Sequence, residues 1–120
     1  MKAHRPKEIF GPGSGFVVAR LNGEAVGCGA WRSLGESAPG VAEIKRMFVE
    51  AKARGRGISR QILAELERFA RADGYTTVRL ETGLRQPQAM RLYETSGYWR
   101  IEPYGRYRDD PLSMCYEKAL

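Results

Sequence analysis

The first half of the chain alternates apolar and polar residues, which is the period-two pattern typical of strands. Phe16–Leu21 is one such run, and the Asn22-Gly23 pair behind it is a strong hairpin signal because both turn positions must accept positive φ. We therefore expect a hairpin of strands over 16–21 and 24–31. After a loop with several glycines, a third strand is expected over 41–49.

The periodicity changes at Ile58, where apolar residues begin to recur on one face of a helix. That face is formed by Ile58, Ile62, Leu63, Leu66, Phe69 and Ala70, with Arg60, Glu65, Glu67 and Arg71 elsewhere around the helix. Gly74 follows as a left-handed stop. A second, shorter helix opens at Gln86-Pro87, where the fixed φ of proline suits a first helical position, and closes at Gly97.

Three further extended runs, 75–81, 98–101 and 112–118, complete the order β-β-β-α-β-α-β-β. This order predicts an α/β protein with a mixed sheet, in which the opening strands are antiparallel. The strands 41–49 and 75–81 should form a right-handed parallel crossover around the long helix. We expect residues 1–120 to form a single domain, with residues 1–15 as a flexible lead-in.

Composition narrows the class of protein without giving a function. The chain has 120 residues, a net charge of +6 and a pI near 9.6. Its 42% hydrophobic and 28% charged residues are typical of a globular protein, and no apolar run reaches the ~20 residues of a membrane span. The first ten residues lack the apolar segment of a secretory signal, so we expect a cytoplasmic protein with no membrane association.

Cysteine and histidine are too few for a metal site or a histidine-based triad. Cys28 and Cys115 lie far apart in the sequence, and His4 is the only histidine. We expect both cysteines to be free thiols that pack as small apolar residues, and we expect no metal.

The connection between the third strand and the long helix has the composition of an anion-binding turn. Gly55 and Gly57 allow close approach of the backbone to a ligand, and the first amides of the helix have no internal partner. Residues 45–60 carry six basic side chains against one acidic, a local charge of +5. The alternative is a tight glycine turn with solvated arginines.

Two common phosphate-binding motifs do not fit this turn. A dinucleotide fingerprint would need a third glycine where Arg60 stands, and a Walker A loop would need Gly-Lys followed by Ser or Thr. The strands that precede the turn are expected to be antiparallel, which also argues against a Rossmann start.

Two motifs instead resemble those of the GNAT superfamily of N-acetyltransferases. Arg54-Gly55-Arg56-Gly57-Ile58-Ser59 looks like the family's signature for the acyl-CoA pyrophosphate, with Ser59 as the departure. The stretch 86–98 is similar to the family's Asn-x-x-Ala-x-x-Leu-Tyr-x-x-x-Gly-Phe, with Gln86 for Asn and Tyr98 for Phe. The resemblance covers about residues 16–120 and implies a GNAT-like fold that is short at its N-terminal end.

The resemblance implies that the chain moves an acetyl group from acetyl-CoA to a primary amine by direct transfer in a ternary complex. It also implies a bulge in the strand 41–49 that splays it from its neighbour and frees backbone amides for the pantetheine arm. The cofactor-binding residues implied are Met47, Phe48, Val49, Arg54, Gly55, Arg56, Gly57, Ile58, Ser59 and Gln86.

Two residues are candidates for acid and base catalysis. Glu43 is similar in place to the family's glutamate base, and its alternative role is a carboxylate that balances Lys45 or Arg46. Tyr93 matches the family tyrosine that protonates the leaving sulfur, and its alternative role is a core tyrosine on the face of Ala89 and Leu92.

The acceptor stays open between small-molecule and peptide amines. Tyr104, Arg106, Tyr107 and Arg108 occupy the loop where the family lines its acceptor pocket, and they suit an aromatic or anionic acceptor unless the loop is simply solvated. Because the family's N-terminal helices have almost no counterpart here, we expect an open acceptor cleft, a shortened chain, or a cleft completed by a partner subunit such as a second copy in a homodimer.

Two other functions are alternatives. A catalytically inactive acyl-CoA-binding domain would keep the pyrophosphate turn without turnover. A basic nucleic-acid-binding module would account for the pI, but the sequence has no evident recognition helix or stacking motif, so we do not expect nucleic acid as a partner.

Overall fold

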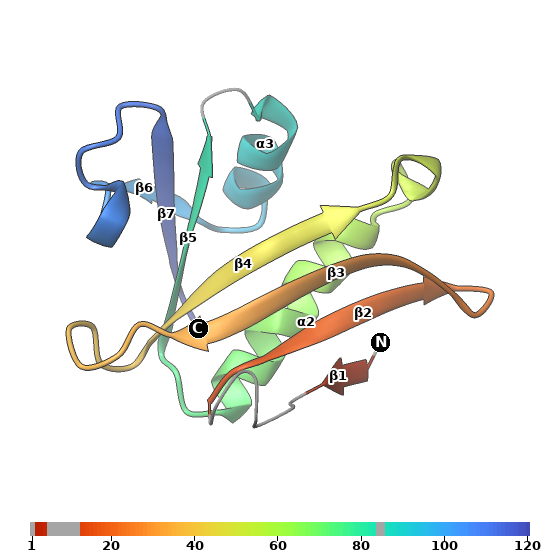
Figure 1. Cartoon of the computed structure of the whole chain (residues 1–120), viewed down its shortest axis with the longest axis horizontal. Coiled ribbons are helices and arrows are strands. Elements are labelled where there is room, and N and C mark those ends of the chain that lie inside the picture. The colour runs from red at the N-terminus through yellow and green to blue at the C-terminus, as the bar shows by residue number, and fades with distance from the viewer. Residues whose placement is uncertain (1, 5–12, 84–85) are drawn as a thin grey trace.

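The computed structural model describes residues 2–4, 13–83 and 86–120. A seven-stranded sheet with the order β1-β2-β3-β4-β5-β7-β6 forms the body of the described chain (Figure 1). The strands are β1 (Lys2–His4), β2 (Gly15–Leu21), β3 (Glu24–Ser33), β4 (Val41–Val49), β5 (Thr77–Gly83), β6 (Trp99–Ile101) and β7 (Ser113–Ala119). Two α-helices, α2 (Ile58–Ala72) and α3 (Pro87–Thr95), and two single-turn helices, η1 (Ala51–Ala53) and η2 (Gly105–Tyr107), complete the described elements.

The six strands and two helices predicted from the sequence are all present, with bounds that move by up to two residues. The pairs β2–β3 and β3–β4 are antiparallel and the pair β4–β5 is parallel, as predicted. The pairs β1–β2, β5–β7 and β6–β7, for which the sequence made no prediction, are antiparallel. Asn22 and Gly23 both have positive φ, 52° and 83°, which confirms the hairpin turn between β2 and β3.

The lead-in expected over residues 1–15 is corrected in part. Lys2–His4 forms the edge strand β1 and pairs antiparallel with β2, and β2 itself begins at Gly15. Three residues carry too short a pattern to predict a strand, so only the sheet edge offered by β2 reveals it. Residues 5–12 of the lead-in lie outside the described residues.

Helix α2 packs across one face of β2, β3 and β4 (Figure 1). Ile62, Leu63 and Leu66 are almost fully buried there against Val17 and Ile44. This close contact requires Gly29 on β3, because a Cβ there would lie 2.7 Å from Leu66 Cδ1. The helix face predicted from the sequence therefore forms the core.

Glu67 lies outside the apolar face that the sequence predicts for α2. It is buried, accepts a hydrogen bond from Tyr98 Oη at 2.8 Å, and forms an ion pair with Lys118 Nζ at 2.9 Å. Both partners come from strands or turns far along the chain, so the helical periodicity alone could not reveal this buried pair.

Strand β4 is paired unevenly along its length, and this positions the site. On the β3 side, Cys28 pairs with Phe48 and Ala30 with Lys45, so two residues of β4 oppose Gly29 in a bulge. Arg46 sits in the bulge with φ of 57°. On the other side, β5 pairs only with Val41–Glu43, and Figure 1 shows the two strands diverging beyond that point. The expected bulge and splay are both confirmed.

Candidate active site

A groove with a volume of 710 Å³ occupies the region where β4 and β5 separate. Its walls come from the end of β4, the turn before α2, the first turn of α2, and one face of α3. The lining residues are Met47, Phe48, Val49, Ala53, Arg54, Gly55, Gly57, Ile58, Ser59, Arg60, Gln86, Gln88, Ala89, Arg91, Leu92 and Tyr93. We call this space the groove.

The turn before α2 has the backbone shape that the two glycines were expected to allow. Gly55 and Gly57 have φ of 82° and 74°, and Gly57 is the N-cap residue of α2. No side chain caps this helix, and the first intrahelical bond runs from Gln61 N to Gly57 O. The amides of Ile58, Ser59 and Arg60 therefore precede the intrahelical pattern, at the positive end of the helix dipole.

The charged side chains that line the groove are all basic: Arg54, Arg60 and Arg91. Arg54 Nε donates to Val49 O at 3.1 Å, which joins the turn to the end of β4. Arg60 donates to Thr95 Oγ1 and Ser96 Oγ, both at 3.0 Å, and so joins the start of α2 to the end of α3. Such a space favours a ligand with several negative charges.

Nine of the ten predicted cofactor residues line the groove, and Arg56 is the one that does not. Its side chain is exposed in the turn, beside Gly55 and Gly57. Sequence spacing could not separate Arg54 from Arg56, because their relative orientation depends on the positive φ of Gly55 between them. The arginines missed by the sequence reasoning are Arg60 and Arg91.

Tyr93 stands on α3 with its side chain 6% exposed and lines the groove. Its ring packs near those of Tyr98 and Tyr116, with centroids 5.8 Å and 5.9 Å away. Burial and then the charge of Glu81 raise the pKa of Tyr93 to about 12. Within the described part of the chain its hydroxyl has no hydrogen-bond partner, so that hydroxyl is available to a ligand.

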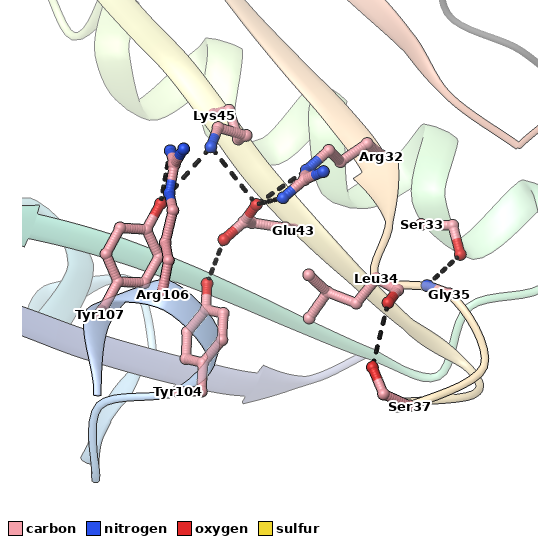
Figure 2. A network of polar contacts seen from close by, with 10 residues as sticks. All are labelled: Arg32, Ser33, Leu34, Gly35, Ser37, Glu43, Lys45, Tyr104, Arg106 and Tyr107. Atoms are coloured by element: carbon pink, nitrogen blue, oxygen red, sulfur yellow. Dashed lines mark hydrogen bonds and ion pairs between the residues drawn. The ribbon is translucent and has the colours of Figure 1, made fainter. Parts of the chain in front are cut away.

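Glu43 is not in the groove. It is 2% exposed on β4, where three neighbours hold its carboxylate, as Figure 2 shows. Arg32 Nε and Tyr104 Oη donate to its two oxygens at 2.9 Å and 2.6 Å. Lys45 Nζ lies 3.6 Å from Oε1. The alternative role, a carboxylate that balances nearby basic residues, therefore describes its contacts.

The same neighbours set the protonation of Glu43. Burial raises the pKa of Glu43, but hydrogen bonds from Tyr104 and Arg32, together with the charges of Lys45 and Arg32, outweigh burial, so its pKa lies below the ordinary carboxyl value. A carboxylate stabilised in this way is a weaker base than a free one.

A second cavity, of 320 Å³, lies beside this network. It is lined by Ala30, Trp31, Arg32, Lys45, Arg46 and Arg106. We call it the basic pocket. Lys45 and Arg46 are followed directly on β4 by Met47, which lines the groove, so consecutive residues of one strand line the two cavities at the bulge.

The loop between β6 and β7 contributes to this pocket in part. Arg106 lines it, while Tyr104 and Tyr107 contact Glu43 and Lys45 respectively. Arg108 lines neither cavity. Sequence reasoning named this loop but missed Arg32 and Arg46, which only the pairing of β3 with β4 brings to it.

Known proteins resemble this chain in sequence and in fold. The chain matches the Acetyltransferase (GNAT) family over residues 2–98. It belongs to that family.

An "IAA acetyltransferase" of Azospirillum brasilense is 44% identical over 105 residues, which are 88% of this chain and 67% of that one. A solved structure of a candidate acyl-CoA N-acyltransferase from Klebsiella pneumoniae has a TM-score of 0.83 and 39% identity over 89% of this chain and 72% of that one. A GNAT acetyltransferase of Elizabethkingia anophelis, solved with acetyl-CoA bound, has the same fold, with a TM-score of 0.76 and 20% identity over 90% of this chain and 77% of that one.

The GNAT fold and the enzyme class predicted from the two motifs, an acetyl-CoA-dependent N-acetyltransferase acting on amine acceptors, are thereby confirmed. The GNAT assignment also gives the groove a ligand to test. The three arginines and the uncapped N-terminus of α2 suit the diphosphate of coenzyme A. The edge of β4 that β5 leaves unpaired suits its amide-rich arm.

The remaining expectations concern metals, thiols and membranes. Among the described residues no cluster of His, Cys, Asp and Glu has the makings of a metal site, and both cysteines are free. Cys115 is buried as expected, whereas Cys28 is half-buried with Sγ 3.5 Å from the Arg46 carbonyl oxygen. No helix in the described ranges is long and apolar enough to cross a bilayer.

Proposed function

We propose that this chain transfers the acetyl group of acetyl-CoA directly to an amine acceptor while both are bound. The observation that carries the proposal is the shared wall of β4: Met47–Val49 line the groove, while Lys45 and Arg46, the two residues before them, line the basic pocket. Two substrates bound in the two cavities would meet at the bulge. Such an arrangement makes a covalent enzyme intermediate unnecessary.

The phosphate end of acetyl-CoA would bind at the turn 54–60. The amides of Ile58 and Ser59 and the side chains of Arg54 and Arg60 supply donors and positive charge there. Ser59, where the family signature has a smaller residue, also lines the groove and adds a hydroxyl to the set.

The unpaired edge of β4 beyond Glu43 supplies the next part of the site. Its backbone groups around Met47–Val49 would hydrogen-bond the pantetheine arm as a neighbouring strand would, and an amide of this edge would donate to the thioester oxygen as negative charge develops on it. The amine nitrogen then forms a bond to the acetyl carbon, the carbon–sulfur bond breaks, the nitrogen loses a proton, and the sulfur leaves with the electron pair of the broken bond.

Tyr93 would act on that sulfur. Burial holds its pKa at about 12, while a thiol has an ordinary pKa of about 8.5. Full proton transfer to the thiolate would therefore run uphill, so we assign Tyr93 a hydrogen bond that stabilises the leaving sulfur.

The contacts of Glu43 do not favour the role of general base that the family resemblance implies for it. Its carboxylate lies beside the basic pocket, but both of its oxygens are engaged and its pKa is lowered. We propose that Glu43 positions Arg32 and Lys45 and that the acceptor amine loses its proton to solvent.

Binding of acetyl-CoA tests the groove. At a concentration 100-fold above Kd, acetyl-CoA should raise Tm by roughly 10 °C. Arg54→Glu should abolish this rise because it reverses a charge in the groove. Arg71→Glu makes the same charge change at the exposed far end of α2 and should leave the rise intact. Equal behaviour of the two variants would contradict the placement of the phosphates.

Turnover tests the transfer. Release of coenzyme A thiol across a panel of amines is the expected result. A thermal shift without thiol release for any acceptor would instead support an inactive acyl-CoA-binding domain.

A further inference from the structure

The four charged side chains that line the basic pocket, Arg32, Lys45, Arg46 and Arg106, are all cationic. Resting on the function proposed above, we propose that the acceptor is a small amine that also carries a carboxylate, as a free amino acid does, and that Lys45, Arg46 and Arg106 bind the carboxylate. This names the substrate class of the acceptor cavity.

The first support is the balance of charge. Among the described residues, Glu43 is the one carboxylate in contact with these four cations, and it pairs with Arg32 at 2.8 Å and with Lys45 at 3.6 Å. Arg106 donates to the hydroxyl of Tyr107 at 3.3 Å. Four positive charges against this carboxylate and the more distant Glu81, whose charge also acts on Arg106, leave the pocket with a positive surplus, which an anionic ligand would offset.

The second support is that a residue of the pocket, Arg32, already binds a carboxylate beside it. Arg32 and Tyr104 already hold one carboxylate, that of Glu43, at 2.8–2.9 Å and 2.6 Å (Figure 2). Guanidinium groups pair with carboxylates through directed N–H donors. Arg46 and Arg106 have no carboxylate partner in the described part of the chain, so their donors are available to a second one.

The third support is the size and position of the cavity. A volume of 320 Å³ lies at the lower end of the range of small-molecule pockets, about 300–1,000 Å³, which suits one amino acid better than a protein segment. Lys45 and Arg46 lie immediately before the part of β4 that faces the groove. A carboxylate held by them would place a neighbouring amine close to the bulge.

The positive charges of the basic pocket would also favour the neutral form of the acceptor amine, which is the nucleophile. Nearby positive charges lower the pKa of an ammonium group, because they disfavour its charged form. The basic pocket would therefore shift a bound amine toward its neutral, nucleophilic state, which removes the need for a free carboxylate base. The field also excludes polyamines, whose several positive charges it repels.

The test uses the full chain with acetyl-CoA and follows release of coenzyme A thiol. The twenty standard amino acids are compared first, and the one acetylated fastest is then compared with its amide and its decarboxylated amine, with spermidine alongside. We expect kcat/KM to be at least 10-fold higher for the amino acid than for either analogue that lacks the carboxylate, and no turnover of spermidine. Equal or faster acetylation of the analogues or of spermidine would overturn the inference.

Variants assign the preference to named side chains. Arg106→Gln and Arg46→Asn should each raise KM for the amino acid about 10-fold with little change for the decarboxylated amine; Asn tolerates the positive φ at this position. Arg20→Gln, on the exposed part of β2 and outside both cavities, is the control and should change neither. An equal rise in KM for the amino acid and for the decarboxylated amine in these variants would contradict the inference.

A binding measurement separates this inference from the proposed function. The N-acetylated amino acid should raise Tm more than its N-acetylated amide, and Arg106→Gln should remove the difference. If acetyl-CoA gives no thermal shift but this difference is present, the proposed function is wrong and the assignment of the basic pocket as a carboxylate site is upheld. If acetyl-CoA binds and amines are acetylated but no carboxylate preference appears, only the assignment of the basic pocket as a carboxylate site is wrong.

Discussion

The two cavities that β4 helps to line are built from different parts of the chain. The groove relies on backbone: an unpaired strand edge, a bulge, two glycines with positive φ and the first amides of α2. The basic pocket relies on side chains, namely Arg32, Lys45, Arg46 and Arg106, with the carboxylate of Glu43 beside the first two. A ligand common to a whole family suits a site made of backbone, whereas a substrate particular to one chain suits a site made of side chains.

The contrast is sharpest between two buried ionisable groups. Both oxygens of Glu43 are engaged, while the hydroxyl of Tyr93 has no partner among the described residues. The carboxylate of Glu43 is therefore held by contacts within the chain, whereas the hydroxyl of Tyr93 is available to a ligand. Substitutions on the pocket side should change stability most, and substitutions on the groove side should change turnover most.

The largest effect is expected for Glu43→Gln. The variant weakens the two hydrogen bonds that Arg32 and Tyr104 donate to a buried carboxylate, so the free energy of unfolding should fall by about 3 kcal/mol in urea denaturation. Glu65→Gln, which breaks the more exposed pair with Arg68 at 2.6 Å, is the matched control, and its effect should stay below about 1 kcal/mol. A loss of turnover of about 100-fold without loss of stability would instead identify Glu43 as a general base.

The stability of the wild type should also depend on Glu43 through pH. Because the pKa of Glu43 is lowered in the folded protein, its contribution is fully present above the ordinary value of 4.5 and disappears as pH falls through the lower folded pKa. Urea denaturation between pH 6 and the acid range should show a steeper loss for the wild type than for Glu43→Gln. Parallel curves would contradict this assignment.

Tyr93→Phe should have the next largest effect, this time on catalysis. Removing the hydroxyl that stabilises the leaving sulfur should lower kcat by roughly 100-fold, with KM for acetyl-CoA little changed. Stability should change little, because that hydroxyl has no partner in the described residues to lose. Tyr116→Phe, which removes a hydroxyl bonded to Glu94 outside the groove, is the control and should retain turnover.

Gly29→Ala tests the packing that supports the bulge. The new Cβ would lie 2.7 Å from Leu66 Cδ1 and 2.9 Å from both Ile62 Cγ2 and Met47 Sδ. These side chains must shift, so we expect a loss of about 2 kcal/mol of unfolding free energy and a weaker thermal shift with acetyl-CoA. Gly83→Ala, where a Cβ meets open space, should leave both measurements close to the wild type.

The smallest effect is expected at the bulge itself. Arg46 has φ of 57°, which a β-branched residue adopts poorly, so Arg46→Val should reduce stability by about 1 kcal/mol. Arg46→Asn removes the same charge but accepts this conformation and should be close to neutral in urea denaturation. If both variants unfold alike, the conformation of the bulge does not depend on this residue.

Much of the fold could be predicted from local patterns. Period-two runs, the Asn22-Gly23 turn and the apolar face of α2 each specify an element from residues close together in the chain. The short edge strand β1 could not be predicted, because three residues of β1 gain their structure from hydrogen bonds to β2. The burial of Glu67 was missed for the same kind of reason, since its partners Tyr98 and Lys118 are 31 and 51 residues away.

The candidate site divides in a similar way. The sequence by itself determined the turn that forms one wall of the groove, because its glycines and the start of the helix follow one another from residue 54 to residue 60, and family motifs preserve such local runs. Only the tertiary structure decided the basic pocket, because it joins Arg32 of β3, Lys45 and Arg46 of β4, and Arg106 of the last loop. Charges from three separate segments have no spacing that a sequence can reveal, and they act together only once the strands pair.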